Sequence, residues 1–93
     1  MARLVITRRA LSHLSRLPSD LREAVDRAVD RIAADPEVGK ALLGRLAGTW
    51  AMRVGNYRIL YTVEGRLPRR TVVVRSVRHR AVAYGQRRRR SSR

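Results

Sequence analysis

The chain has 93 residues, a length that fits one domain. It has no cysteine, which excludes disulfides and thiolate metal sites, and no apolar run approaches the roughly 18 residues of a membrane span. Its 22 basic and 7 acidic side chains give a formal net charge of +15. Arginines interrupt the apolar residues near the N-terminus, so we expect no secretory signal and no membrane partner, and a cytoplasmic protein.

A short apolar run and two helical patterns open the chain. Residues 3–7 are expected to form a strand, with Thr7 capping a helix whose apolar positions are Ala10, Leu11, Leu14 and Leu17. Pro18 ends this helix, and Ser19 is expected to cap the next one. In the second helix, apolar residues recur three or four positions apart, at Leu21, Ala24, Val25, Ala28, Val29 and Ile32. Asp35-Pro36 ends it, so the pattern predicts two antiparallel helices.

The next segment has the two-residue period of strands. Trp50, Met52 and Val54 alternate with other residues, and Gly55-Asn56 is a predicted two-residue hairpin turn. This turn places Arg53 opposite Arg58 on the open face of the sheet. The face toward the helices then has Trp50, Met52, Ile59 and Tyr61.

Two further strands are predicted, over residues 57–64 and 71–77, with a turn over 65–70 that contains Pro68. The register of the last strand stays open: either Val72, Val74 and Ser76 or Val73, Arg75 and Val77 point inward. Residues 78–84 are expected to be irregular or briefly helical. A domain of residues 1–86 and a disordered basic tail of residues 87–93 complete the chain. The order of elements predicts an α+β fold, with a helical hairpin packed on an antiparallel sheet.

Positive charge is concentrated in the second half. Residues 1–50 have nine basic and six acidic side chains, whereas residues 51–93 have thirteen basic ones and one acidic one, Glu64. Apart from Lys40, every basic residue is arginine, whose planar donor fork suits phosphate. This asymmetry favours a polyanion as partner, although a solvated, arginine-rich surface would have the same composition.

Arg53 and Arg58, directly opposite each other, repel by roughly 0.2–1 kcal/mol. An anion bound between the two guanidiniums would reverse the sign of that interaction, so we interpret the pair as a candidate phosphate site. The alternative is that both side chains extend into water at little cost. His13, within the first helix, is interpreted as structural.

The end of the last strand gathers a second set of polar residues. Arg78 and Arg80 can hold a phosphate, and His79 or Tyr84 can move a proton or stack on a base. The alternative is a structural role for each of these two residues: His79 would cap a strand end, and Tyr84 would pack at the edge of the core.

The scarcity of acidic residues limits the reaction class. Metal-dependent nucleases need clustered carboxylates, and Glu64 is the one acidic residue after Glu37. We therefore expect neither a metal nor a cofactor. In RNA the 2′-hydroxyl can act as the nucleophile, so the protein needs a base, an acid for the leaving 5′-oxygen and cations that stabilise the transition state.

Several motifs, in order, resemble one known family. Two helices end in RLP and ADP, a central RxGxYRxxY pattern comprises Arg53, Gly55, Tyr57, Arg58 and Tyr61, and the segment VRHRAVAY matches an HRxxxY ending. Over residues 2–86 the chain is similar to the RelE/ParE toxin superfamily. The resemblance implies a microbial-RNase-like fold and a toxin that forms a hetero-oligomer with an acidic antitoxin.

RelE-like members cleave mRNA on the ribosome without a metal, so the resemblance implies a site for that reaction. Its catalytic residues would be Arg53, Arg58, Arg78, Arg80 and Tyr84, with Arg58 on the scissile phosphate. Contacts with RNA, including rRNA, are expected from His79, Arg45, Arg87, Arg88, Arg89 and Arg90. Ala51 stands where RelE has a lysine, and the loop between the central strands is shorter. One alternative is a ParE-like inhibitor of DNA gyrase without nuclease activity, and a second is a plain nucleic-acid-binding domain. The C-terminal arginine and aromatic residues favour the ribonuclease.

Overall fold

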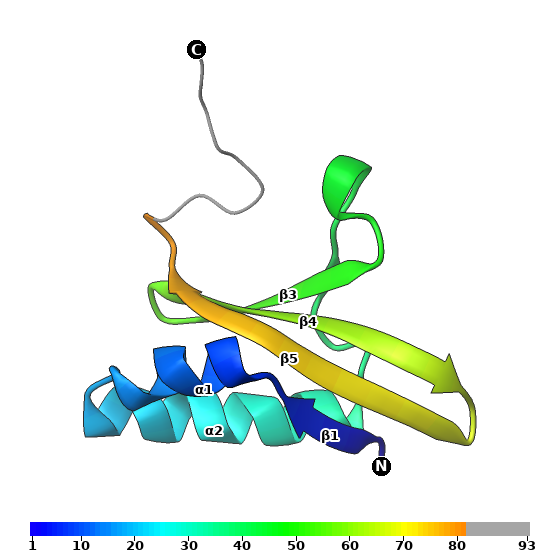
Figure 1. Cartoon of the computed structure of the whole chain (residues 1–93), viewed down its shortest axis with the longest axis horizontal. Helices are drawn as coiled ribbons and strands as arrows, with labels where there is room; N and C mark the ends of the chain where they lie inside the picture. Colours follow the sequence, from blue (N-terminus) through cyan, green and yellow to red (C-terminus); the bar gives the residue numbers. More distant parts are fainter. Residues whose placement is uncertain (82–93) are drawn as a thin grey trace.

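The computed structural model describes residues 1–81, which form a sheet with two helices against one of its faces (Figure 1). The elements, in chain order, are β1 (Arg3–Ile6), α1 (Arg8–Ser15), α2 (Ser19–Ala34), β2 (Lys40–Ala41), the 3₁₀ helix η1 (Gly44–Leu46), β3 (Thr49–Val54), β4 (Tyr57–Arg66) and β5 (Arg69–His79). The strand order is β1-β5-β4-β3-β2, with β1 parallel to β5 and the other neighbours antiparallel. The predicted α+β architecture is confirmed, whereas the sequence pattern predicts neither β2 nor η1.

The helical hairpin forms as predicted, with three corrections. Helix α1 ends at Ser15, so Leu17 lies beyond it and Pro18 is not the residue that ends it. Thr7 caps α1, because its hydroxyl accepts the backbone N–H of Ala10 at 3.1 Å. Ser19 is not the cap of α2; Pro18 takes that position without a side-chain hydrogen bond. Leu11 points away from the core and is 50% exposed. Neither helix of the described residues is long and apolar enough to cross a membrane.

The core lies between the two helices and the face of the sheet that they cover, the lower face in Figure 1. Its largest fully buried side chains come from α2, β4 and β5: Val25, Ile32, Ile59, Tyr61, Val72 and Val74. Trp50 and Met52 are partly buried against this cluster, and the Trp50 ring stacks on that of Tyr61 at a centroid distance of 6.3 Å. The predicted inward face of the central hairpin is therefore confirmed.

The predicted register of the β3–β4 hairpin is also confirmed. Val54 pairs with Tyr57 across the two-residue turn, and Arg53 pairs with Arg58. Gly55 takes a φ of 58°, a left-handed conformation that glycine adopts without a steric cost. The turn chemistry thus sets which side chains share a face.

The β4–β5 hairpin is longer than predicted. Strand β4 ends at Arg66 and β5 begins at Arg69. The turn is therefore the dipeptide Leu67-Pro68 and not the predicted six residues 65–70. At the other end, Arg78 and His79 belong to β5, where an irregular or helical segment was expected. Pairing with Arg58 and Tyr57 continues the strand through these two residues.

A β-bulge resolves the open register of β5. Leu60 pairs with Ser76, but the next residue, Tyr61, pairs with Val74, so Arg75 is the extra residue. Val72 and Val74 point to the core before the bulge, and Val77 does so after it. Neither predicted register therefore holds along the whole strand, because the extra residue inverts the alternation.

Candidate nucleic-acid interface

Three arginines lie side by side on the open face of the sheet. Arg53 on β3 pairs with Arg58 on β4, and Arg58 pairs with Arg78 on β5. Cross-strand partners share a face, and the adjacent residues Ile59 and Val77 are buried against the helices on the other face. We call Arg53, Arg58 and Arg78 the arginine row.

The arginine row concentrates positive charge on rigid backbone. Neighbouring strands lie about 4.8 Å apart, so three guanidiniums project from a width of roughly 10 Å. Like charges opposite each other destabilise a sheet by about 0.2–1 kcal/mol per pair. An anion that bridges them removes this cost through charge-assisted hydrogen bonds. The row is therefore suited to the phosphates of a nucleic acid.

The bulge brings a fourth arginine to the same face. Arg75 donates from Nη2 to a carboxylate oxygen of Glu64 at 3.1 Å and from Nε to the Thr62 hydroxyl at 3.3 Å. Both members of the ion pair are about half exposed, so it adds little stability. Arg75 is not among the site residues predicted from the sequence, because an uninterrupted alternation leaves its face undecided.

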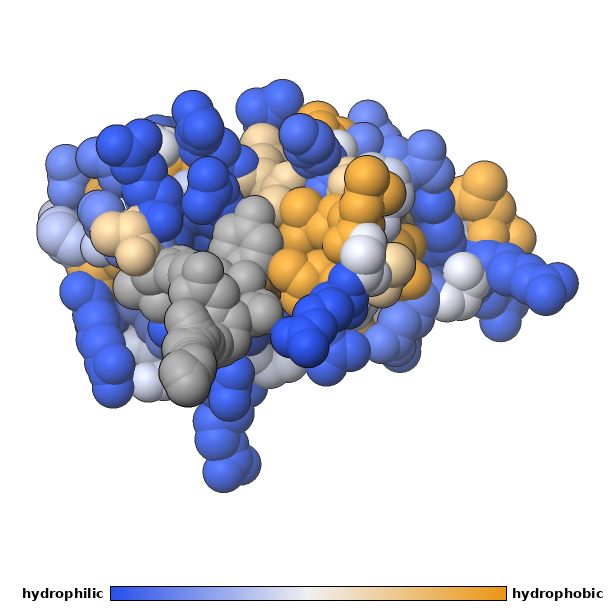
Figure 2. Space-filling view, turned by 90° about the horizontal axis from the view of Figure 1, so that it is seen from above, coloured by the Kyte–Doolittle hydropathy of each residue, from blue (hydrophilic) through white to orange (hydrophobic). Residues whose placement is uncertain are grey.

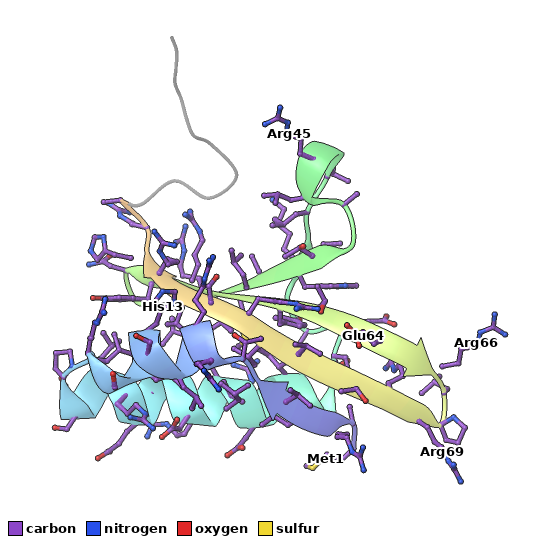
Figure 3. All side chains as sticks on the ribbon, viewed as in Figure 1. Met1, His13, Arg45, Glu64, Arg66 and Arg69 are labelled. Carbon is purple, nitrogen blue, oxygen red and sulfur yellow. The ribbon has the colours of Figure 1, made fainter. Side chains whose placement is uncertain are left out.

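The open face extends under η1. Arg45 lies at the tip of η1, above the sheet, and Glu64 lies on the sheet below (Figure 3). Seen from above, this face is mostly hydrophilic but includes a cluster of hydrophobic residues (Figure 2). Leu43, in the loop that leads into η1, is 87% exposed. The open face thus combines arginines with exposed apolar surface.

His79 lies on the other face of the sheet from the arginine row. It pairs with Tyr57, whose ring it meets edge to face at a centroid distance of 5.1 Å, and Tyr57 packs against the core. Arg80 follows in a turn, and its backbone N–H donates to the Asn56 carbonyl at 2.7 Å. The structure therefore brings Arg78 to Arg53 and Arg58 but separates His79 from them.

Comparison with known proteins identifies the family. Residues 4–84 match the ParE toxins of type II toxin–antitoxin systems (parDE). Toxin RelG of Mycobacterium tuberculosis is 40% identical over 68 residues, which are 72% of this chain and 76% of that protein. The chain belongs to the RelE/ParE superfamily of type II toxins.

Solved structures of related toxins agree with this assignment. The RelBE2 toxin–antitoxin complex of Mycobacterium tuberculosis contains a chain with a TM-score of 0.74 and 34% identity, covering 83% of this toxin and 95% of that chain. The YoeB/ParE toxin of Agrobacterium tumefaciens has a TM-score of 0.70 at 22% identity, covering 83% and 96%. At this lower identity the likeness concerns the fold alone.

His13 of the toxin has the structural role expected from the sequence, at the edge of β5. Strand β1 pairs with β5 only as far as Val74, which leaves later backbone groups of that edge without a strand partner. Thr7 donates to the Arg75 carbonyl, and His13 Nδ1 accepts the Val77 N–H at 3.1 Å. The side chains of Thr7, the N-cap of α1, and of His13 thereby bind backbone groups at an edge that has no strand partner there.

We expect the stability of the toxin to fall in mild acid because of His13. Burial, and then the charges of Arg78, Arg16 and Arg9, lower the pKa of His13 from 6.5. The folded state therefore binds fewer protons than the unfolded state. The contribution of neutral His13 to the free energy of unfolding is complete above about pH 6.5 and is lost as pH falls through the pKa of the folded state. Urea unfolding between pH 5 and 8 measures it. A His13→Gln variant should show a shallower pH dependence; an unchanged one would contradict the assignment.

Several predicted site residues lie outside the described residues: Tyr84, Arg87, Arg88, Arg89 and Arg90. Within residues 1–81, no group of three or more His, Cys, Asp or Glu side chains could hold a metal ion.

Proposed function

We propose that this toxin is a ribosome-dependent endoribonuclease that cleaves mRNA without a metal ion. The observation that supports it is the arginine row, three cations abreast on a rigid sheet. Cleavage of RNA by its own 2′-hydroxyl places extra negative charge on the phosphate oxygens. In many enzymes, preorganised positive charges that stabilise such developing negative charge make the largest single contribution to the rate enhancement.

The reaction breaks one bond and forms another at the same phosphorus. The 2′-oxygen attacks as its proton leaves, and the 5′-oxygen departs and takes up a proton. In this proposal Arg58, at the centre of the row, holds the scissile phosphate between Arg53 and Arg78. Arg80 follows the row in the chain and, with Tyr84, is proposed to act at the leaving group and the adjacent base. The general base is left unassigned, because the described row offers only donors.

We further propose an acidic antitoxin as the physiological partner. The related structure from Mycobacterium tuberculosis is a toxin–antitoxin complex. A net charge of +15 would attract RNA without selection, and an acidic segment that folds on binding can cover such a surface. Co-purification of the toxin with the product of an adjacent small reading frame tests this proposal. A tagged toxin that purifies alone would count against it.

Primer extension after induction tests the reaction. Reporter mRNA should show cuts phased with codons while the ribosome translates it, and none when its start codon is removed. An SOS response without mRNA cuts would instead indicate inhibition of DNA gyrase, as in the ParE-like alternative. Chromosome supercoiling, measured in the same cells, separates the two functions.

The C-terminal arginines are proposed to add affinity and not catalysis. Deleting residues 87–93 removes five arginines. Every phosphate that the shortened toxin no longer neutralises should reduce the slope of log affinity against log salt by roughly 0.7–0.9. The affinity of the shortened toxin for ribosomes should therefore depend less on salt than the affinity of the full-length toxin. Binding measured over a range of about 50 to 300 mM salt resolves such slopes. The cleavage pattern at saturating toxin should stay the same, and its disappearance would overturn this division of roles.

A further inference from the structure

A cavity of about 300 Å³ opens on the helix side of the sheet, between the C-terminal end of α1 and the adjoining ends of β4 and β5. We propose that it binds one unpaired nucleotide of an RNA, with the base against Tyr57 and His79 and the phosphate at Arg16 and Arg78. The inference extends the proposed function, because it assumes that RNA crosses the neighbouring arginine row. It assigns a site that lies beyond that row, around the end of β5.

Hydrogen bonds fix which polar atoms the two histidines offer. His13 Nδ1 accepts the Val77 N–H at 3.1 Å, and His79 Nδ1 accepts the Ala81 N–H at 3.0 Å. In each neutral ring the proton therefore lies on Nε2, which is left to donate. With Arg16 and Arg78, the rim of the cavity is rich in donors and matches phosphate oxygens and base carbonyls.

The rest of the lining suits a base. Leu17 and Val77 supply apolar surface, and Tyr57 and His79 supply two rings in edge-to-face contact. Unpaired RNA bases are recognised in proteins by stacking on aromatic rings, combined with hydrogen bonds to their polar edges. A cavity of this volume is at the lower end of small-ligand sites, which is appropriate for a single nucleotide.

The charges around His13 favour an anion at the same place. Arg16, the C-cap of α1, and Arg78 from β5 line the cavity. Burial lowers the pKa of His13, and the charges of Arg78, Arg16 and Arg9 lower it further. A phosphate beside them would offset that positive charge. Arg78 also pairs with Arg58 in the arginine row, so one residue borders both sites. An RNA strand that leaves the row past Arg78 reaches the cavity next.

NMR titration of the full-length toxin with 5′-UMP tests the proposal. The protein carries Arg58→Ala, so that neither catalysis nor the centre of the arginine row contributes. The nucleotide should shift the ring resonances of His13, Tyr57 and His79 and raise the pKa of His13. Uridine and inorganic phosphate, titrated separately, should each bind more weakly than the nucleotide. Equal effects from phosphate alone would mean an anion site without base recognition and would overturn the proposal.

Two variants provide the matched comparison. Arg16 and Arg9 both act on His13, but only Arg16 lines the cavity. Arg16→Ala should weaken 5′-UMP binding about tenfold, the effect of one charge-assisted hydrogen bond, whereas Arg9→Ala should leave it unchanged. Equal weakening in both variants would reduce the effect to general electrostatics and overturn the site. Tighter binding of an acidic peptide than of the nucleotide would assign the cavity to a protein partner instead.

The outcome is independent of the primer-extension result. Nucleotide binding at the cavity without mRNA cuts would retain this site while removing the proposed cleavage. Cuts without shifts at His13 and Tyr57 would retain cleavage and remove this site.

Discussion

Arg58→Ala should lower the rate of mRNA cleavage by roughly 10²–10³-fold and abolish growth inhibition, because it removes the central donor to the developing phosphate charge. Arg58 lies on β4 between Arg53 and Arg78, so the substitution leaves a gap in the middle of the row. The fold should survive, with a change in unfolding free energy below about 1 kcal/mol, because one member of a like-charged row is removed. Single-turnover cleavage on programmed ribosomes and a urea unfolding curve measure the two effects.

Two further variants define what Arg58 supplies. Arg58→Lys keeps the charge but loses the planar fork and should be partly active. Arg66→Ala is the control, since it removes the same charge from the far, exposed end of the same strand. It should leave cleavage unchanged. A folded Arg58→Ala toxin with full toxicity would refute the phosphate site and lead back to the gyrase-type alternative.

The position of the arginine row shows how much of the site a sequence can predict. Gly55-Asn56 limits the hairpin to a two-residue turn, and that turn fixes the partner of every residue in β3 and β4. The apolar alternation then determines which face is buried. From these local rules Arg53 and Arg58 are placed correctly, without any knowledge of the rest of the fold.

Arg75 and His79 show where such reasoning fails. The bulge at Arg75 depends on how β5 fits two neighbours at once, β4 on one side and β1 on the other. No local pattern signals one extra residue in a run of valines. Once the bulge is in place, Arg75 reaches the open face and His79 the helix face. Their roles therefore follow from tertiary pairing.

The sequence pattern also does not predict the structure of the connection from α2 to β2. Strand β2 has two residues, Lys40 and Ala41, and is held by pairing with Ala51 and Trp50 of β3, which follow it in the chain. The Tyr61 hydroxyl anchors the segment that precedes β2. It donates to the Pro36 carbonyl at 2.8 Å and accepts the Gly39 N–H at 3.1 Å. A buried tyrosine of β4 thus fixes a loop more than twenty residues earlier.

Gly39→Ala should be among the most destabilising single substitutions in this toxin. An added Cβ would lie 2.6 Å from the Tyr61 hydroxyl oxygen and 2.7 Å from the Ala51 carbonyl oxygen, and the second is backbone that cannot rotate away. Overpacking of this kind costs roughly 1–3 kcal/mol, which lowers the melting temperature by about 5–20 °C in a domain of this size. Calorimetry of the purified variant measures the shift.

A double-mutant cycle with Tyr61→Phe tests the cause. Tyr61→Phe alone leaves the Gly39 N–H and the Pro36 carbonyl without their partner, at a cost of about 1–3 kcal/mol. In the Gly39→Ala background the same change should cost less, by roughly 0.5 kcal/mol or more, because the added methyl group has already displaced the hydroxyl. Strictly additive effects would show that the methyl group is accommodated without moving Tyr61. The strain would then fall on Ala51 and hence on β3, the strand that positions Arg53, and Gly39→Ala should reduce cleavage even at temperatures where the toxin is folded.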